Sequence, residues 1–280
     1  MFFVFKLRKL LTVIFALSLI LICVITGHTK EAEVKVPIIM YHSILKNNPH
    51  NSEYIISPEA LESDLAFLNE NGFTAITVND LTDYVYNNKP LPEKPIMLTF
   101  DDGHYNNYYY AYPLMKKYNM KMVISVVGEY TEQFSKEDAS NPNYSYLTWQ
   151  QIDELQKSGY AEIQNHTYSM HKINSSRYGC MKSKSESVEE YQSLLCQDLT
   201  LLQNTLKEKT GTSPVAFTYP FGKISKYSFD VIKNMGFKAS FSCEEGIAKI
   251  TKTPDSLYRL KRFIRPPNIP SADYFDKILH

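Results

Sequence analysis

The sequence predicts an α/β protein, a distorted (β/α) barrel with seven or eight parallel strands. Short apolar runs alternate along the chain with amphipathic helical segments, which is the pattern of buried parallel strands joined by helices. Seven or eight such units in roughly 240 residues fit a closed or nearly closed barrel better than an open sheet.

The expected strands are apolar runs of five or six residues, too short to be helices. Several of them end at a polar residue or a turn-forming residue. In chain order they are residues 36–41, 73–78, 95–100, 122–127, 160–165, 214–219, 237–241 and 260–264.

The expected helices lie between these strands and are identified by start signals or by an apolar face. Ser57 caps the first helix, with a proline in its first turn. Asn79 caps the second, and residues 148–151 have the form of a capping box that opens another. A long helix from about 187 to 207 carries apolar side chains on one face. The remaining helices are expected at residues 105–118 and 228–235.

The N-terminal segment, residues 1–27, has three basic residues followed by an uncharged apolar run from residue 10 to residue 27. A run of roughly 18 residues is about the minimum that spans a bilayer as a helix. Basic residues before it place that end in the cytoplasm and send the rest of the chain outward. An uncleaved transmembrane anchor is favoured over a cleaved signal peptide, which has the same layout with a shorter apolar core. Both alternatives predict a bacterial cell-surface protein, anchored or secreted, with a linker at 28–35 and one domain at 36–280.

The composition argues against several classes of protein. Lys plus Arg and Asp plus Glu number 30 each, so no net charge attracts nucleic acid. The chain has no Gly-rich phosphate loop or Walker motif, so nucleotide binding has no support. Three cysteines outside the apolar segment, Cys180, Cys196 and Cys243, lack metal-type spacing. One disulfide among them is an alternative, but we expect incidental thiols.

Polar residues follow the predicted strands at the point where four of them end. In a parallel barrel the carboxyl ends of all strands lie at one face, where active sites form. We therefore expect these residues to meet although they are far apart in the sequence. They are His42, Asp101, Asp102, His166, and the run Tyr219, Pro220 and Phe221.

The adjacent carboxylates of Asp101 and Asp102 would repel each other unless a cation binds or one stays protonated. Without further signals, the sequence Asp-Asp-Gly is more simply explained as a turn. His166 and His171 favour a metal, because with Asp102 they form the His₂Asp set of a catalytic zinc with one open position. Imidazole ligands favour Zn²⁺, or another divalent transition metal, over Mg²⁺ or Ca²⁺. The alternative is two exposed loop histidines.

Three motifs carry a resemblance to a known family. Thr99-Phe-Asp-Asp-Gly103, His166-Thr-x-x-x-His171 and Tyr219-Pro-Phe-Gly222 resemble those of the polysaccharide deacetylase superfamily, also called NodB-homology or carbohydrate esterase family 4. The resemblance covers residues 36 to about 264. It implies a distorted barrel, often with seven strands, and a metal-dependent carbohydrate deacetylase. It also implies that Asp101 is the general base and that Asp102, His166 and His171 bind the metal.

Two departures from the usual pattern indicate a branch of this family. The histidines lie five positions apart instead of four, and Met40-Tyr-His42 occurs early. Both features resemble the branch that deacetylates β-1,6-linked poly-N-acetylglucosamine in biofilm matrices, in which the early histidine is the general acid. The alternative for His42 is a packed strand-end histidine with a satisfied ring. Thr218 stands where the family usually has an arginine, so we consider Arg262 as a replacement.

The expected reaction is hydrolysis of N-acetyl groups from an extracellular N-acetylglucosamine polysaccharide, with release of acetate. A metal-activated water would attack the acetamide carbonyl while Asp101 accepts a proton and His42 protonates the sugar amine. The backbone N–H of Phe221 would hold the oxyanion. Peptidoglycan, chitin oligomers and O-acetylated xylan are alternative substrates.

Two other classes of function are weighed against this one. A glycosidase needs two carboxylates about 5 Å or more apart on either side of the scissile bond, which adjacent aspartates rarely provide. A non-catalytic carbohydrate-binding module would be expected to lack the base or a metal ligand, and neither is missing. His104, which follows the acidic motif, is expected to be a solvent-facing loop residue.

Overall fold

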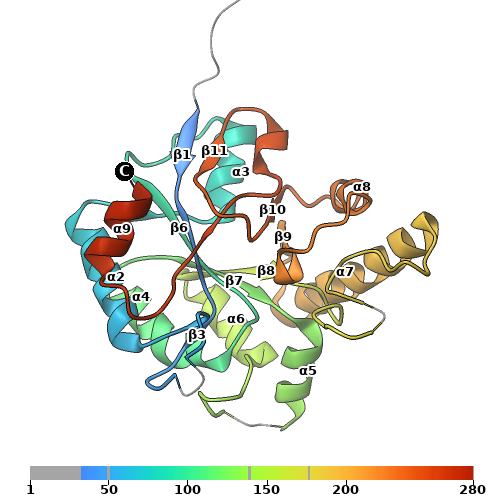
Figure 1. The fold of residues 1–280 in the computed structure, drawn as a ribbon, viewed down its shortest axis with the longest axis horizontal. Coiled ribbons are helices and arrows are strands. Elements are labelled where there is room, and N and C mark those ends of the chain that lie inside the picture. The colour runs from blue at the N-terminus through green and yellow to red at the C-terminus, as the bar shows by residue number, and fades with distance from the viewer. Residues whose placement is uncertain (1–32, 49–50, 138–139, 176, 280) are drawn as a thin grey trace, which may run out of the picture. The chain divides into compact units, whose positions relative to one another are not determined.

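The computed structural model describes residues 33–48, 51–137, 140–175 and 177–279 (Figure 1). The predicted anchor or signal at 1–27, and most of the 28–35 linker, lie outside the described residues. Within the described ranges no helix has both the length and the apolar character needed to cross a membrane. The domain start at residue 36 stays a prediction, and a strand already begins at Val34.

The predicted distorted (β/α) barrel is confirmed by a curled sheet whose pairings are all parallel. Its backbone pairs span the eight predicted regions, although several strands are shorter than expected. In spatial order the strands are β10 (Ala239–Phe241), β9 (Ala216–Thr218), β8 (Ala161–Asn165), β7 (Met122–Val126), β6 (Pro95–Phe100), β2 (Ile38–Tyr41) and β12 (Phe263–Ile264), with β5 (Thr74–Ala75) beside β6.

The two ends of this sheet are joined by residues 260–265, which we call the closing segment. Leu260 donates its backbone N–H to Ser240 of β10 at 2.7 Å and accepts one from Ser242 at 3.0 Å. At the other end of the segment β12 pairs with β2, and Arg265 donates its N–H to Met40 at 3.1 Å. The closing segment therefore connects the first and last strands of the sheet.

Arg265 anchors the closing segment to the helices outside the sheet. Its guanidinium donates to both carboxylate oxygens of Asp64, at 2.9–3.1 Å, and both side chains are buried. Tyr41 and Ser271 also donate hydroxyl hydrogen bonds to Asp64, at 3.0 and 2.6 Å. A buried ion pair with these additional partners joins β2, two helices and the segment in one network.

The helices cover the sheet, and their sequence signals explain most of their ends. Capping boxes start three of them, at Thr77, Thr148 and Ser187. The helices are α2 (Pro58–Glu70), α3 (Val78–Asn87), α4 (Tyr112–Lys117), α5 (Gly128–Glu137), α6 (Trp149–Lys157), α7 (Val188–Thr210), α8 (Ser228–Asn234) and α9 (Ser271–Leu279). In Figure 1, α9 lies beside α2, with which it packs.

The predicted start of α3 at Asn79 is wrong, because Thr77 is the N-cap. The Thr77 hydroxyl accepts the Asp80 N–H, and the Asp80 carboxylate accepts the Thr77 N–H at 2.8 Å. This capping box has aspartate at its last position. Because Thr77 is the N-cap of α3, the strand expected at 73–78 is shortened to Thr74–Ala75.

The helix expected at 105–118 is divided into a π-helix, η1 (Asn107–Ala111), and α4. Pro113 has no N–H to donate to the preceding turn, so the backbone changes its hydrogen-bonding pattern just before it. Other elements were not predicted. They are α5, α9, the paired strands β1 (Val34–Val36) and β11 (Ala248–Ile250), the paired strands β3 (Ser43–Ile44) and β4 (Ile55–Ile56), and the short turns η2 (Pro220–Gly222) and η3 (Pro254–Leu257).

Candidate active site

A cavity of about 640 Å³ lies where the parallel strands end. It is lined by most of the predicted site residues, together with side chains from the segments around β3, β4 and Tyr146. The predicted residues that line it are His42, Asp101, Asp102, His166, His171 and Phe221. The topology thus brings together residues that are up to about 180 positions apart.

Tyr219 and Pro220 are the two predicted site residues that do not line this cavity. Tyr219 is buried in a second apolar cluster beneath α7, and its hydroxyl lies 2.9 Å from the hydroxyl of Ser228. Pro220 is buried beside it. Phe221 has a positive φ of 57°, which turns its ring toward the cavity, 4.4 Å from the ring of His171.

The two adjacent aspartates point in different directions because the backbone turns between them. Asp101 directly follows β6 and donates its N–H to the Tyr41 carbonyl of β2 at 3.0 Å, whereas Asp102 has a positive φ of 71° and Gly103 one of 73°. Asp102 is a residue type that tolerates this conformation better than most. A side chain at Gly103 would also meet Val126 at 3.0 Å. The turn therefore presents two carboxylates to two separate environments.

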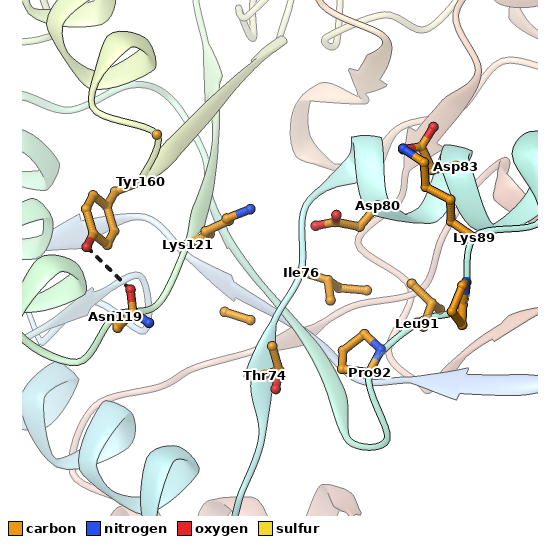
Figure 2. A pocket seen from close by; sticks show the side chains of 13 residues that line it. Thr74, Ile76, Asp80, Asp83, Lys89, Leu91, Pro92, Asn119, Lys121 and Tyr160 are labelled. Carbon is orange, nitrogen blue, oxygen red and sulfur yellow. Dashed lines mark hydrogen bonds and ion pairs between the residues drawn. The ribbon is translucent and has the colours of Figure 1, made fainter.

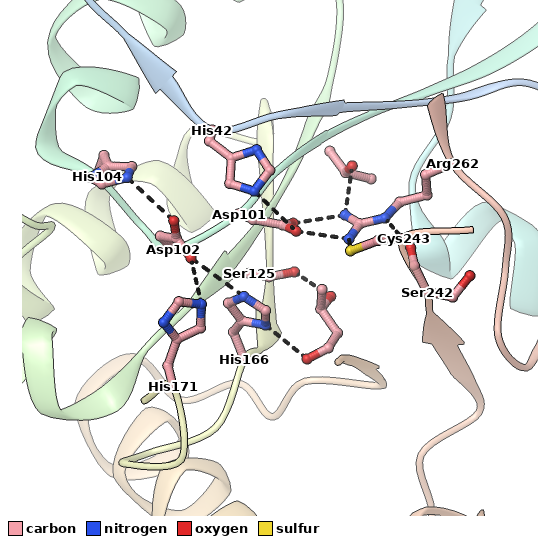
Figure 3. A network of polar contacts seen from close by, with 12 residues as sticks. His42, Asp101, Asp102, His104, Ser125, His166, His171, Ser242, Cys243 and Arg262 are labelled. Atoms are coloured by element: carbon pink, nitrogen blue, oxygen red, sulfur yellow. Dashed lines mark hydrogen bonds and ion pairs between the residues drawn. The ribbon is translucent and has the colours of Figure 1, made fainter. Parts of the chain in front are cut away.

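Asp101 is held by Arg262 of the closing segment (Figure 3). The guanidinium donates from Nη1 and Nη2 to the two carboxylate oxygens, each at 2.8 Å. Nε donates to the carbonyl of Ser242 at 2.9 Å, and Nη1 also reaches the Thr99 hydroxyl at 3.1 Å. Burial raises the pKa of Asp101, but the charge and hydrogen bonds of Arg262 outweigh it and leave that pKa below its usual value.

This contact supplies the arginine partner that the sequence motif lacks. Arg262 is fully buried, and Asp101 is 2% exposed. Thr218, at the position where the family usually has arginine, instead offers its carbonyl to His166 Nδ1 at 2.8 Å. The replacement considered from the sequence is therefore in contact with Asp101, although 161 residues separate the two.

Asp102, His166 and His171 form a group whose possible ligand atoms all lie within 4.8 Å of one another. Asp102 Oδ1 lies 3.4 Å from His166 Nε2 and 3.1 Å from His171 Nε2. Yet Oδ1 is buried and has no hydrogen-bond partner among the described residues. Three converging donors, one of them an unpaired carboxylate oxygen, fit a divalent transition metal.

Neighbouring groups orient the ring of His166 and keep Asp102 charged. The Thr218 carbonyl on His166 Nδ1 fixes the tautomer that leaves Nε2 free to act as a ligand. Burial raises the pKa of Asp102, but interactions with His104, His166 and His171 hold that pKa well below its usual value. A carboxylate that stays charged when buried is suited to a cation.

Asp198 of α7 holds the loop that carries the two histidines. Its carboxylate accepts the N–H of Tyr168 at 2.7 Å, and the N–H and hydroxyl of Ser169 at 2.8 Å each. Thr167, between them and His166, has a φ of 74°, a strained conformation for a β-branched residue. Asp198 was not predicted as a functional residue, although a charged residue within the apolar face of a helix is a signal that could have revealed it.

His42 faces the other carboxylate. Its Nε2 lies 3.9 Å from Asp101 Oδ2, and its ring meets the edge of Tyr54 at 4.8 Å. Its Nδ1 is buried without a hydrogen-bond partner among the described residues. Burial lowers the pKa of His42, and the nearby charge of Asp101 only partly offsets this effect.

His104 does not face solvent as predicted. Its side chain is 21% exposed, and its Nε2 lies 3.4 Å from Asp102 Oδ2. The ring stacks on Tyr146 with 4.9 Å between centroids. Trp149, the first residue of α6, is buried, and its indole N–H donates to Glu132. The three cysteines outside the apolar segment are free, and Cys243 lines the cavity.

A second cavity, of about 590 Å³, lies where β7 and β8 begin, at the opposite end of the sheet (Figure 2). It is lined by polar side chains that include Asp80, Lys121 and Tyr160. None of the predicted site residues lines it. The cavity that contains the predicted aspartates and histidines is the one at the carboxyl ends of the strands.

Comparison with known proteins agrees with this geometry. The family model described as polysaccharide deacetylase matches residues 88–240, which is more than half of the 280-residue chain. The chain belongs to the polysaccharide deacetylase family. The resemblance inferred from the three motifs is thereby confirmed, and the hydrolase class that it implied is that of the family. The matched region includes Asp101, Asp102 and both histidines of the metal group.

Individual relatives of this polysaccharide deacetylase are similar at a lower level. A poly-beta-1,6-N-acetyl-D-glucosamine N-deacetylase of Escherichia coli K12 is 25% identical in an alignment of length 240 that covers 79% of this chain and 36% of that protein. The chain thus spans about a third of that relative. One of the same name from Staphylococcus aureus MRSA252 is 24% identical in an alignment of length 269 that covers 86% of this chain and 87% of that protein. The solved Streptococcus pyogenes deacetylase PplD superposes with a TM-score of 0.72 at 24% identity, covering 88% of this chain and 99% of that one, and supports the fold.

Proposed function

We propose that this protein removes N-acetyl groups from a neutral N-acetylglucosamine polymer at the bacterial cell surface and releases acetate. One observation carries the proposal. A carboxylate with a fixed orientation, a histidine and a three-residue metal group lie in one cavity at the carboxyl ends of the strands. The names of the Escherichia coli and Staphylococcus aureus relatives support poly-β-1,6-N-acetylglucosamine as the polymer.

Asp102, His166 and His171 are the residues that would hold a divalent metal, with zinc favoured. When bound there, zinc would supply a Lewis acid and lower the pKa of a bound water. Asp101 would accept the proton of the attacking water. Arg262 keeps both of its oxygens in place, so little reorientation is needed during the reaction.

His42 would protonate the leaving amine, because it lies across the cavity from the metal group and beside Asp101. In the free protein burial lowers the pKa of His42. Asp101 would pass the proton that it gains from the water to His42, whose Nε2 lies 3.9 Å away, and the imidazole would then be charged again. The backbone N–H of Phe221, next to His171, is the proposed oxyanion donor.

The lining of the cavity favours a neutral sugar over peptidoglycan. Among the described residues that line it there is no lysine or arginine. The lactyl carboxylate of a muramic acid would therefore find no cationic partner there. Four tyrosine side chains also line the cavity and offer faces suited to pyranose rings: Tyr54, Tyr144, Tyr146 and Tyr178.

Release of acetate tests the proposal directly. The protein is incubated with poly-β-1,6-N-acetylglucosamine, chitin oligomers, peptidoglycan and acetyl-xylan, each with and without chelator. Acetate from the first polymer, abolished by chelator and restored by Zn²⁺, is the expected result. Shortened chains would indicate a glycosidase instead, and binding without any product would indicate a carbohydrate-binding module. Detection of the chain on the cell surface by protease accessibility tests its location.

A further inference from the structure

We propose that His104 is a positioning residue that holds the side chain of Asp102 in its metal-binding orientation. This inference rests on the proposed metal site. His104 Nε2 lies 3.4 Å from Asp102 Oδ2, while the other oxygen, Oδ1, faces His166 and His171. In Figure 3 His104 approaches Asp102 from the side opposite His171.

The two oxygens of Asp102 therefore have different partners. Oδ1 has no hydrogen bond among the described residues and belongs to the metal group. Oδ2 is the oxygen next to His104, which is not part of that group. A carboxylate ligand held through its second oxygen loses the freedom to rotate away, and such outer contacts strengthen metal binding.

The imidazole of His104 is itself fixed from two directions. Its ring stacks on Tyr146 at 4.9 Å with an interplanar angle of 27°. The backbone on each side is also bonded, since Tyr105 donates to the Ser145 carbonyl at 2.8 Å and Leu147 donates to the Gly103 carbonyl at 2.8 Å. The backbone of His104 is thus pinned to the segment 145–147, and Tyr146 of that segment also lines the cavity.

The need for such a contact follows from the backbone of Asp102. A positive φ of 71° directs this side chain away from the path of β6, so the strand itself does not determine where the carboxylate points. Of the three histidines next to Asp102, His104 is the one whose printed contact is with Oδ2, while those of His166 and His171 are with Oδ1. Without it, the contacts of the Asp102 carboxylate with His166 and His171 at Oδ1 would remain, but Oδ2 would lose its contact with His104.

The test distinguishes the effect of the His104 N–H donor from the effect of packing the His104 ring against Tyr146. His104→Phe keeps an aromatic ring against Tyr146 but removes the donor, whereas His104→Gln keeps a donor of similar reach. Tyr109→Phe, on an exposed tyrosine of η1, is the control. Each metal-free protein is titrated with Zn²⁺ in competition with a chromophoric chelator, and its thermal midpoint is measured without metal.

We expect His104→Phe to weaken Zn²⁺ binding by about 10- to 100-fold. His104→Gln should retain most of the affinity, and the metal-free midpoints of the two variants should agree. Equal affinity of His104→Phe and the wild type would overturn the inference. An equal loss in both variants would also overturn it, because the ring packing would then be the cause. If the wild type binds no Zn²⁺, the proposed metal site itself is wrong.

Discussion

Replacing Arg262 by methionine removes the partner of Asp101 while leaving a side chain that fills part of the same space. Asp101 would then be a carboxylate that is 2% exposed and has no cation beside it, apart from His42 at 3.9 Å. The two lost hydrogen bonds, at 2.8 Å each, are to a charged group and are worth roughly 1.5–3 kcal/mol each. Breaking a buried ion pair from one side costs about 3–5 kcal/mol, which agrees with that sum.

We therefore expect Arg262→Met to lower the free energy of unfolding by about 3–5 kcal/mol at pH 7. The assay is urea denaturation of the metal-free protein, so that metal affinity does not contribute. The double variant Asp101→Asn with Arg262→Met carries no buried charge at this position, and it should recover much of the loss. Stability of the single variant within about 1 kcal/mol of wild type, or a double variant as unstable as the single one, would refute the reasoning.

The ion pair between Arg262 and Asp101 also predicts how the loss of stability in Arg262→Met depends on pH. In the wild type the pKa of Asp101 is lowered, so its stabilisation is present above the unfolded pKa and is lost as pH falls through the folded value. In Arg262→Met burial is no longer opposed by the guanidinium, and the pKa of Asp101 should rise above its unfolded value. The difference in stability between the two proteins should therefore be largest at neutral pH and shrink as the solution is acidified.

Three further predictions concern the base, the histidine loop and a helix cap. Asp101→Asn should reduce acetate release about 10²- to 10⁴-fold while zinc content, measured by elemental analysis, stays at the wild-type level. Asp198→Ala should cost about 1–3 kcal/mol in urea denaturation and also weaken Zn²⁺ binding, because three donors of the loop lose their acceptor. Unchanged zinc affinity would mean that Asp198 does not hold the loop. Thr77→Ala should lower the free energy of unfolding by about 1 kcal/mol without changing acetate release, whereas Asn79→Ala, at the wrongly predicted cap, should have a smaller effect.

Much of the fold could be predicted because buried parallel strands are continuous apolar runs. Residues 95–100 and 122–127 show this, and both form strands with almost the predicted bounds. The helix α5 was missed because residues 128–137 are mostly polar and follow β7 without a turn signal. The N-cap at Thr77 was missed because the apolar run continued through it.

Most of the site could be predicted for a different reason. One rule, that parallel strands end at one face, brings His42, Asp101 and His166 together without any knowledge of their contacts. Contacts made by backbone groups could not be predicted in this way. The Thr218 carbonyl on His166 has no signature in the sequence, because every residue type has a carbonyl. The direction of His104 depends on the turn at Asp102 and on a distant loop, which local patterns do not report.

The closing segment carries two arginines three positions apart that face opposite sides of the sheet. Arg262 reaches inward to the proposed base, and Arg265 reaches outward to Asp64 of α2. In the sequence, the closing segment comes after all the remaining strands of the sheet. As the chain emerges during synthesis, Asp101 therefore stays without its guanidinium until nearly the whole domain has been made. Catalytic competence becomes a late event in biogenesis, acquired only when the last strand is docked and its outer anchor is in place.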